Sequence, residues 1–284
     1  MKVAESSIET ADRGSPARDF VAVRGVCKSY MTRSGDNVVA LRGVNLEIAR
    51  DEFVTFVGPS GCGKSTLLKL ISGHLKPSEG ELHVNGRRLE KPSRDIGMVF
   101  QRPVLLPWRT VLDNILFPIE MLGWRIGDYM EEANRLIDLV GLRGFERARP
   151  DELSGGMQQR VAICRALVYD PQLLLMDEPF AALDAMTREE LGMELLNIWT
   201  RRRKTVVFVT HSITEAVLLA DRVVVMTPRP GQIVEEIPIT LPRPRMLGME
   251  FSDAFKDYVE RIRGLIHSRP AAPAGNGRAH GGAA

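Results

Sequence analysis

The chain has 284 residues, of which 44% are hydrophobic, 26% charged and 6% aromatic. This composition supplies a large core and excludes a disordered, fibrous or disulfide-scaffold protein. With 38 basic and 36 acidic residues, the net charge is only +2 and does not indicate nucleic-acid binding. The longest apolar runs fall far short of the ~20 residues that span a bilayer, so we expect a cytoplasmic protein without a membrane-spanning segment.

Short apolar runs alternate with helical patterns between two polar tails, residues 1–18 and 268–284, which we expect to be disordered. The alternation predicts an α/β fold with a largely parallel sheet. Period-2 patterns and an Asn85-Gly86 turn near the N-terminus predict a small antiparallel subdomain as well. The expected parallel strands are 52–57, 172–176, 205–210 and 222–226, and the expected antiparallel strands are 20–30 and 80–84.

Helical patterns dominate three parts of the chain. Residues 108–148 predict a helical insert, because apolar residues recur there at helical spacing. Capping boxes at 187–190 and 212–215 predict two helix starts. A final helix over 252–267 carries Phe255, Val259, Ile262 and Ile266 on one face, which we expect to pack against the domain. The three cysteines and five histidines show no metal-ligand spacing, which argues against a structural metal.

The segment 53–66 carries the strongest chemical signal. A strand-like run precedes Gly58-Pro-Ser-Gly-Cys-Gly-Lys-Ser-Thr66 and a helical run follows it, which is the required context of a GxxxxGK[ST] phosphate loop. The glycines let successive N–H groups face a nucleotide's phosphates. Lys64 is expected to reach the β- and γ-phosphates, and Ser65 offers a hydroxyl to Mg²⁺. This loop alone does not distinguish kinases, GTPases and motor ATPases.

A second motif, Leu173-Leu-Leu-Met-Asp-Glu-Pro179, places two carboxylates at the end of a buried strand. Asp177 is expected to hold the Mg²⁺ shell, and Glu178 to polarise the attacking water. Acidic pairs at strand ends are common on protein surfaces. The phosphate loop elsewhere in the chain is what favours catalytic roles here.

A third motif, Leu153-Ser-Gly-Gly-Met-Gln-Gln-Arg160, opens a helix and forms another anion site. One nucleotide does not need two such helix starts at its γ-phosphate from one subunit. The phosphate loop, LSGGMQQR, LLLMDEP and a later strand ending in His211 resemble, in this order, the ATP-binding subunit of an ABC transporter. The resemblance covers residues 20–241.

The resemblance implies a P-loop NTPase fold of the ABC ATPase type, with a RecA-like parallel-sheet core, an antiparallel β subdomain and a helical subdomain. It places the ATPase domain at 19–242, the helical subdomain at about 102–165, and a C-terminal linker and helix at 243–267. It also implies a head-to-tail dimer of two copies. In that dimer, Ser154 and Gly156 of one copy close over the ATP that the phosphate loop of the other copy binds.

The family's functional residues carry over to matching positions. The resemblance implies that Tyr30 stacks on adenine and that Asp184 communicates across the dimer. It assigns catalysis to Glu178, His211, Lys64 and Gln101, and Mg²⁺ binding to Ser65, Gln101 and Asp177. The implied ATP contacts are Tyr30, Gly58, Pro59, Ser60, Gly61, Cys62, Gly63, Lys64, Ser65, Thr66, Gln101, Ser154, Gly155, Gly156 and Asp184.

The apolar, proline-bearing segment 101–115 is typical of a surface that receives another protein. The resemblance implies that this partner is a membrane permease, and that the chain lies peripherally on the cytoplasmic side of the membrane. The LLPW pattern and Met226-Thr-Pro-Arg-Pro-Gly231 resemble the nitrate, sulfonate and taurine import branch, in which an external solute-binding protein holds the cargo. No nucleic-acid partner is expected.

Two alternatives stay open at the level of sequence. A soluble ABC ATPase could act on nucleic acid or ribosomes, although no second cassette or coiled coil is visible. A non-catalytic nucleotide-sensing scaffold is the other alternative. Loss of Glu178 or His211 would favour the scaffold, and both residues are present.

Overall fold

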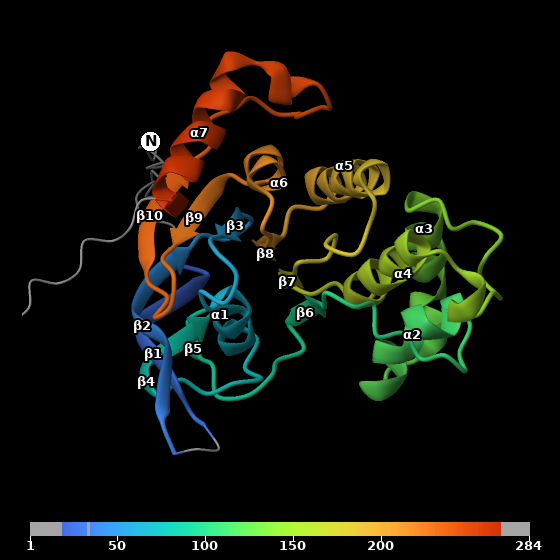
Figure 1. Ribbon diagram of the computed structural model, residues 1–284. Coiled ribbons are helices and arrows are strands. Elements are labelled where there is room, and N and C mark those ends of the chain that lie inside the picture. Colours follow the sequence, from blue (N-terminus) through green and yellow to red (C-terminus); the bar gives the residue numbers. More distant parts are fainter. Residues whose placement is uncertain (1–18, 33–34, 268–284) are drawn as a thin grey trace, which may run out of the picture.

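The computed structural model describes residues 19–32 and 35–267, so the two expected tails lie outside the described residues. The chain forms two sheets (Figure 1). One is antiparallel, in the order β2 (Asn37–Ile48), β1 (Val21–Met31), β4 (Glu79–Val84) and β5 (Arg87–Arg88). The predicted strands 20–30 and 80–84 correspond to β1 and β4, and the prediction of a small antiparallel subdomain is confirmed.

The second sheet has six strands, and β10 pairs antiparallel with β9 at one edge. The other five run parallel, because their register pairs β9, β3, β8, β7 and β6 in the same direction. All four predicted parallel strands are present, whereas β2, β5 and β10 were not predicted. The order is β10 (Ile233–Pro238), β9 (Arg222–Met226), β3 (Phe53–Val57), β8 (Thr205–Val209), β7 (Leu173–Asp177) and β6 (Ile96–Val99).

Helix α1 (Lys64–Ile71) lies between the two sheets. Its buried residues, including Leu67 and Leu68, share one core cluster with Val21 and Leu41 of the antiparallel sheet and with Phe56 of β3. Burial of apolar residues on both sides fixes this helix. Because α1 begins directly after β3, the same packing also fixes the loop between them.

The other helices cover the rest of the parallel sheet. The predicted helical insert is confirmed, and Figure 1 shows α2, α3 and α4 gathered on the side of the parallel sheet away from the antiparallel sheet. Short 3₁₀ helices connect several elements. The helices are α2 (Val111–Met121), α3 (Met130–Leu139), α4 (Gly155–Leu167), α5 (Ala185–Arg201), α6 (Ile213–Leu219) and α7 (Asp253–His267), with 3₁₀ turns at Ile126–Tyr129, Pro150–Glu152 and Met249–Phe251.

One predicted helix start was wrong and another was half right. Helix α5 begins at Ala185, so Asp184 and not Thr187 is its N-cap. Ser212 does cap α6 by accepting from the Glu215 N–H, but the Glu215 carboxylate accepts from Thr210 instead of completing the box. Short polar side chains near a helix start compete for the same unpaired backbone N–H groups. The sequence pattern alone does not show which side chain accepts from them.

The predicted packing of the C-terminal helix is confirmed. Phe255 and Ile262 of α7 are buried, and Val259 and Ile266 pack against the same core cluster. Within the described residues, no helix is both long and apolar enough to pass through a lipid bilayer.

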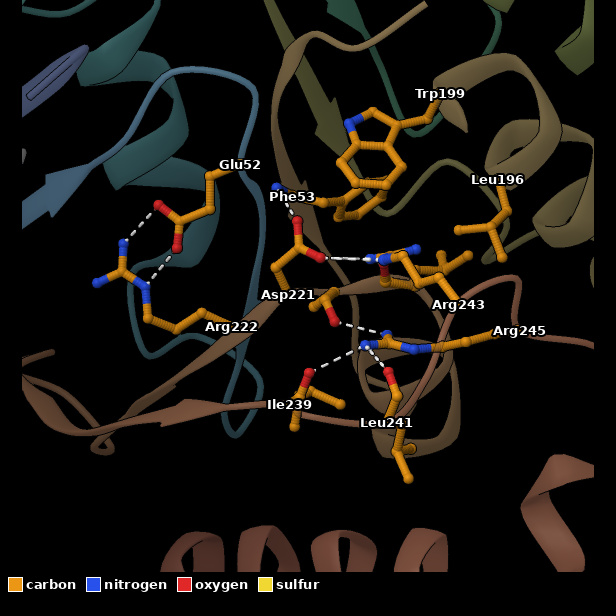
Figure 2. Close-up of polar contacts among 12 residues, drawn as sticks. Glu52, Phe53, Leu196, Trp199, Asp221, Arg222, Ile239, Leu241, Arg243 and Arg245 are labelled. Carbon is orange, nitrogen blue, oxygen red and sulfur yellow. Dashed lines mark hydrogen bonds and ion pairs between the residues drawn. The ribbon is translucent and has the colours of Figure 1, made fainter. Parts of the chain in front are cut away.

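Two arginines attach the segment before α7 to the parallel sheet (Figure 2). Arg243 donates to Asp221 and its guanidinium lies 4.3 Å from the Trp199 ring centroid. Arg245 is only 2% exposed, and it donates to carbonyls at the end of α6 and to those of Ile239 and Leu241. The orphan carbonyls of a buried helix C-terminus are thereby satisfied. Burial lowers the pKa of Arg245 to about 10.

Replacement of this buried arginine tests the attachment. Arg245→Met keeps most of the side-chain volume but leaves several buried carbonyls without a donor, so the free energy of unfolding should fall by about 2 to 4 kcal/mol. Urea titration followed by circular dichroism measures it. Arg263→Met, at an exposed position of α7, is the control and should change stability little. Equal losses in the two variants would contradict the role of Arg245.

Candidate functional site

A cavity of about 440 Å³ lies where β3 ends, beside the antiparallel sheet. Residues from β1, β2 and the loop 58–66 surround it, together with Glu178 at the end of β7. Adjacent parallel strands end at the same edge of a sheet, and this edge is where open α/β sheets bind ligands. The lining residues are Tyr30, Thr32, Val38, Ala40, Ser60, Gly61, Gly63, Lys64, Ser65, Thr66, Glu178 and Arg229.

The loop 58–66 adopts a conformation that requires its glycines. Gly61 and Gly63 have φ of 75° and 105°, in the left-handed region that side chains disfavour. A Cβ on Gly63 would also lie 2.6 Å from the Leu41 side chain. Gly63 is the N-cap of α1 and has no side chain to satisfy the first N–H groups of that helix. The loop can therefore present those N–H groups to an anion.

Lys64 places a buried cation in this loop. Its side chain is 5% exposed, and its amine donates to the carbonyls of Gly58 at 2.8 Å and Pro59 at 3.2 Å. The loop's own carbonyls thus replace most of the water around this buried ammonium group. Held in this way, the charge is available to a phosphate oxygen without a large movement.

Ser65 and Asp177, which lie far apart in the sequence, meet in the structure. The Ser65 hydroxyl donates to a carboxylate oxygen of Asp177 at 2.7 Å. Burial raises the pKa of Asp177, the Ser65 hydrogen bond opposes this rise, and the neighbouring Glu178 charge adds to it. Hydroxyl and carboxylate oxygens are ligands that Mg²⁺ prefers, and Mg²⁺ is bound through few protein ligands beside substrate phosphates. The pair fits that ion.

Three polar side chains from different loops converge beside this pair. Glu178 lies between Gln101, whose amide nitrogen is 3.5 Å from its carboxylate, and His211, whose Nδ1 is also 3.5 Å away. Gln101 follows β6, Glu178 follows β7 and His211 follows β8. Glu178 has φ of 47°, unusual for a residue with a side chain. Such backbone strain clusters at functional sites.

A partly buried ionic network holds the His211 turn. Glu215 accepts from the Thr210 hydroxyl at 2.6 Å, and its other oxygen lies 3.5 Å from Arg188 Nε. Arg188 also donates to the Leu183 carbonyl. Burial raises the pKa of Glu215 above its usual value, and the contacts with Thr210 and Arg188 oppose this rise only in part. The loop before α5 and the turn before α6 are thus joined through side chains that sequence reasoning did not single out.

The motif at 153–160 does not reach the cavity. Ser154 caps α4 by accepting from the Met157 N–H, and both Ser154 and Gly155 are exposed. A Cβ on Gly156 would lie 2.7 Å from the Thr187 side chain, and Thr187 donates to Asp184. These hydrogen bonds lower the pKa of the Asp184 carboxyl. The motif therefore lies against the start of α5, not against the phosphate loop of its own chain.

Comparisons with known proteins agree with this geometry. The ABC transporter family matches residues 41–181. An uncharacterized ABC transporter ATP-binding protein of Methanocaldococcus jannaschii is 55% identical over 82% of this chain and 86% of its own length. The aliphatic sulfonates import ATP-binding protein SsuB of Bacillus cereus is 44% identical over 85% of this chain and 94% of its own. This chain belongs to the ABC transporter ATP-binding family.

Further similarities extend the assignment. The taurine import ATP-binding protein TauB of Jannaschia is 44% identical over 76% of this chain and 81% of its own length. A solved dimeric ATP-binding cassette, in a post-hydrolysis state with ADP and Pi, is 34% identical with a TM-score of 0.69, covering 78% of this chain and 100% of that one. The chain is an ABC-type ATPase, and the predicted P-loop ATPase fold is confirmed.

Most of the sequence-predicted residues of this ABC ATPase meet at one place. Tyr30 lines the cavity and is 40% exposed, and the Lys28 amine lies 5.3 Å from its ring centroid. Cys62 is fully buried and is not among the residues that line the cavity. Arg229 lines the cavity too, and sequence reasoning missed it. In the sequence, the segment 226–231 was notable only for its family resemblance. The pairing of β9 with β3, which brings Arg229 to the cavity, could not be inferred from it.

The Ser65 hydroxyl can be tested as a metal ligand. Ser65→Ala removes one oxygen of the pair with Asp177, so the Mg²⁺ concentration for half-maximal ATP hydrolysis should rise roughly tenfold. Ser65→Thr keeps the hydroxyl and should stay near wild type. An unchanged Mg²⁺ requirement in the alanine variant would show that Ser65 is not a ligand.

Proposed function

We propose that this chain binds and hydrolyses MgATP as the ATPase subunit of an ABC importer, working as a head-to-tail pair of copies. The observation that carries the proposal is the position of Glu178 between Gln101 and His211, at the edge of a cavity that the phosphate loop lines. The family membership and the importer relatives at 44% identity support it.

The proposed hydrolysis uses residues from four strand ends. Glu178 is the general base that takes a proton from the attacking water, and Gln101 and His211 hold that water and the γ-phosphate from either side. Lys64 leaves the carbonyls of Gly58 and Pro59 for the β- and γ-phosphates. Mg²⁺, held by Ser65, Asp177 and Gln101, would neutralise charge on the transferred phosphoryl group. Tyr30 would stack on the adenine ring.

The second copy is proposed because half of the expected site is absent from the cavity. Ser154 and Gly155 are exposed at the start of α4, where a helix N-terminus can bind an anion. A second chain, placed head to tail, would bring these residues over the nucleotide in the first. The dimeric cassette that resembles this chain supports such an arrangement. Asp184, joined to Gly156 through Thr187, would sense the pairing.

The loop 101–110 is the proposed permease contact. Val104 and Trp108 are 63% and 69% exposed, although both are apolar. The loop is nevertheless fixed, because Arg165 donates to the carbonyls of Pro103 and Val104, and the buried Asn114 bonds both the N–H and the carbonyl of Leu106. A rigid loop with exposed apolar side chains suits a protein interface.

The importer setting completes the proposal. The permease subunits would place the ATPase peripherally on the cytoplasmic side of the membrane, and an external solute-binding protein would select the cargo. We propose a small anionic solute of the nitrate, sulfonate or taurine kind, as the names of the SsuB and TauB relatives suggest. The proposed domain spans 19–242, with a helical subdomain at about 102–165 and a C-terminal linker and helix at 243–267.

Glu178→Gln tests the proposed catalytic function. Loss of the general base should lower ATP hydrolysis at least about 100-fold without loss of ATP binding. Because ATP then persists, the variant should elute as a dimer in gel filtration with MgATP and as a monomer without nucleotide. Hydrolysis at the wild-type rate would contradict the role of Glu178. An ATP-bound variant that stays monomeric would contradict the two-copy arrangement.

Trp108→Ala tests the permease contact. A buried interface tryptophan contributes enough that its loss should weaken binding to the permease by at least about tenfold. ATP binding by the isolated chain should not change, because Trp108 does not line the cavity. Phe251→Ala is the matched control, since Phe251 is an equally exposed aromatic residue in another part of the chain. Equal permease binding by both variants would exclude Trp108 from the contact.

A further inference from the structure

The loop between β9 and β10, residues 227–232, has a defined shape. The Thr227 N–H donates to the Gln232 carbonyl at 2.9 Å, and the Thr227 hydroxyl accepts from the Gln232 N–H at 3.0 Å. The same hydroxyl donates to the Pro230 carbonyl at 3.2 Å. The loop is therefore closed on itself by both backbone and side-chain hydrogen bonds. The side chain of Arg229 projects from a constrained turn.

Gly231 holds this turn directly against the phosphate loop. Its N–H donates to the Ala40 carbonyl at 2.9 Å, and its carbonyl accepts from the Arg42 N–H at 3.1 Å. A Cβ on Gly231 would lie 1.9 Å from the Cys62 carbonyl oxygen. Only glycine permits two backbones to approach so closely. The turn therefore packs between β2 and the phosphate loop, and the phosphate loop fixes its position.

Arg229 reaches the cavity from this turn. Its Nε lies 3.3 Å from the Gly61 carbonyl oxygen, and Arg229 lines the cavity with Lys64. Lys64 is buried and engaged with two carbonyls, whereas Arg229 is exposed. Within the described residues, no carboxylate forms an ion pair with Arg229. Most of the donors of its guanidinium are therefore available to a ligand.

The charged residues that line the cavity are consistent with a phosphate-binding role for Arg229. Among its lining residues, Lys64 and Arg229 are the two cations and Glu178 is the one acid. A nucleoside triphosphate brings several negative charges into this space, and a planar guanidinium recognises phosphate oxygens through paired donors. We infer that Arg229 is a nucleotide-binding residue, whose guanidinium contacts the polyphosphate chain of ATP from the side of the cavity opposite Glu178's strand.

The inference rests on ATP binding by this ABC ATPase and adds to it a second cation on the phosphates. Gly231 then has a role as well. By packing on the Cys62 carbonyl, Gly231 sets the distance between Arg229 and the phosphate loop. Arg229 is a contact residue for the nucleotide, and Gly231 is a positioning residue that acts through it.

The test is a fluorescence titration of the full chain with MANT-ATP, MANT-ADP and MANT-AMP at low and high salt. Arg229→Ala should raise the Kd for MANT-ATP roughly three- to tenfold at low salt, with a smaller rise at high salt, because a partly exposed charge contact is screened. The rise should shrink from ATP to ADP to AMP, since fewer charges face the missing guanidinium. Arg229→Lys should recover part of the affinity.

Arg263→Ala removes the same charge from an exposed position of α7 and is the control. Equal Kd values for wild type and Arg229→Ala, or an equal rise in the control variant, would overturn the inference. A rise of the same size for all three nucleotides would overturn it too, because it would mean a distorted loop and not a phosphate contact. Failure of the wild type to bind MANT-ATP would instead overturn ATP binding itself, and this inference with it.

Discussion

Parallel pairing of β6, β7, β8, β3 and β9 is the constraint on which the site depends. Because neighbouring parallel strands end at the same edge, the loops that follow them meet there, however far apart they lie in sequence. Gln101, Glu178 and His211 follow three adjacent strands, and Gln101 and His211 each come within 3.5 Å of the Glu178 carboxylate. Strands β3 and β8 are buried along their whole length and β7 up to Asp177, so apolar packing on both faces holds them in place. A slip of one residue would separate the polar groups.

The packed sheet tolerates costly local structure at that edge. Lys64 is a buried cation, Asp177 is a partly buried carboxylate, and Glu178 has a left-handed backbone conformation. Each would destabilise an isolated loop. Hydrogen bonds from the Lys64 ammonium group to the loop carbonyls and from the Ser65 hydroxyl to Asp177 offset part of the cost. Burial of apolar residues in β3 and α1, which adjoin the loop on both sides, offsets the rest of this free-energy cost.

Side-chain contacts connect the site to α4, α5 and α6. Arg188 and Glu215 join the loop before α5 to the turn that carries His211. Gly156 packs on Thr187, and Thr187 is bonded to Asp184. On the proposed two-copy arrangement, a movement at the exposed start of α4 would therefore reach the histidine turn through packed side chains. Arg165, further along α4, holds the loop that we propose for the permease.

The sequence alone determined the fold class, the phosphate loop and the carboxylate pair, because glycine spacing and buried apolar runs are local patterns that few folds satisfy. It also indicated Gln101 and His211, through family resemblance. Pattern alone did not select Asp184 over Thr187 as the N-cap of α5, since short polar residues compete there for the same donors, and it gave no signal for the network through Glu215. Only the tertiary structure placed Arg229 beside the phosphate loop, because strand order and not chain order brings β9 next to β3.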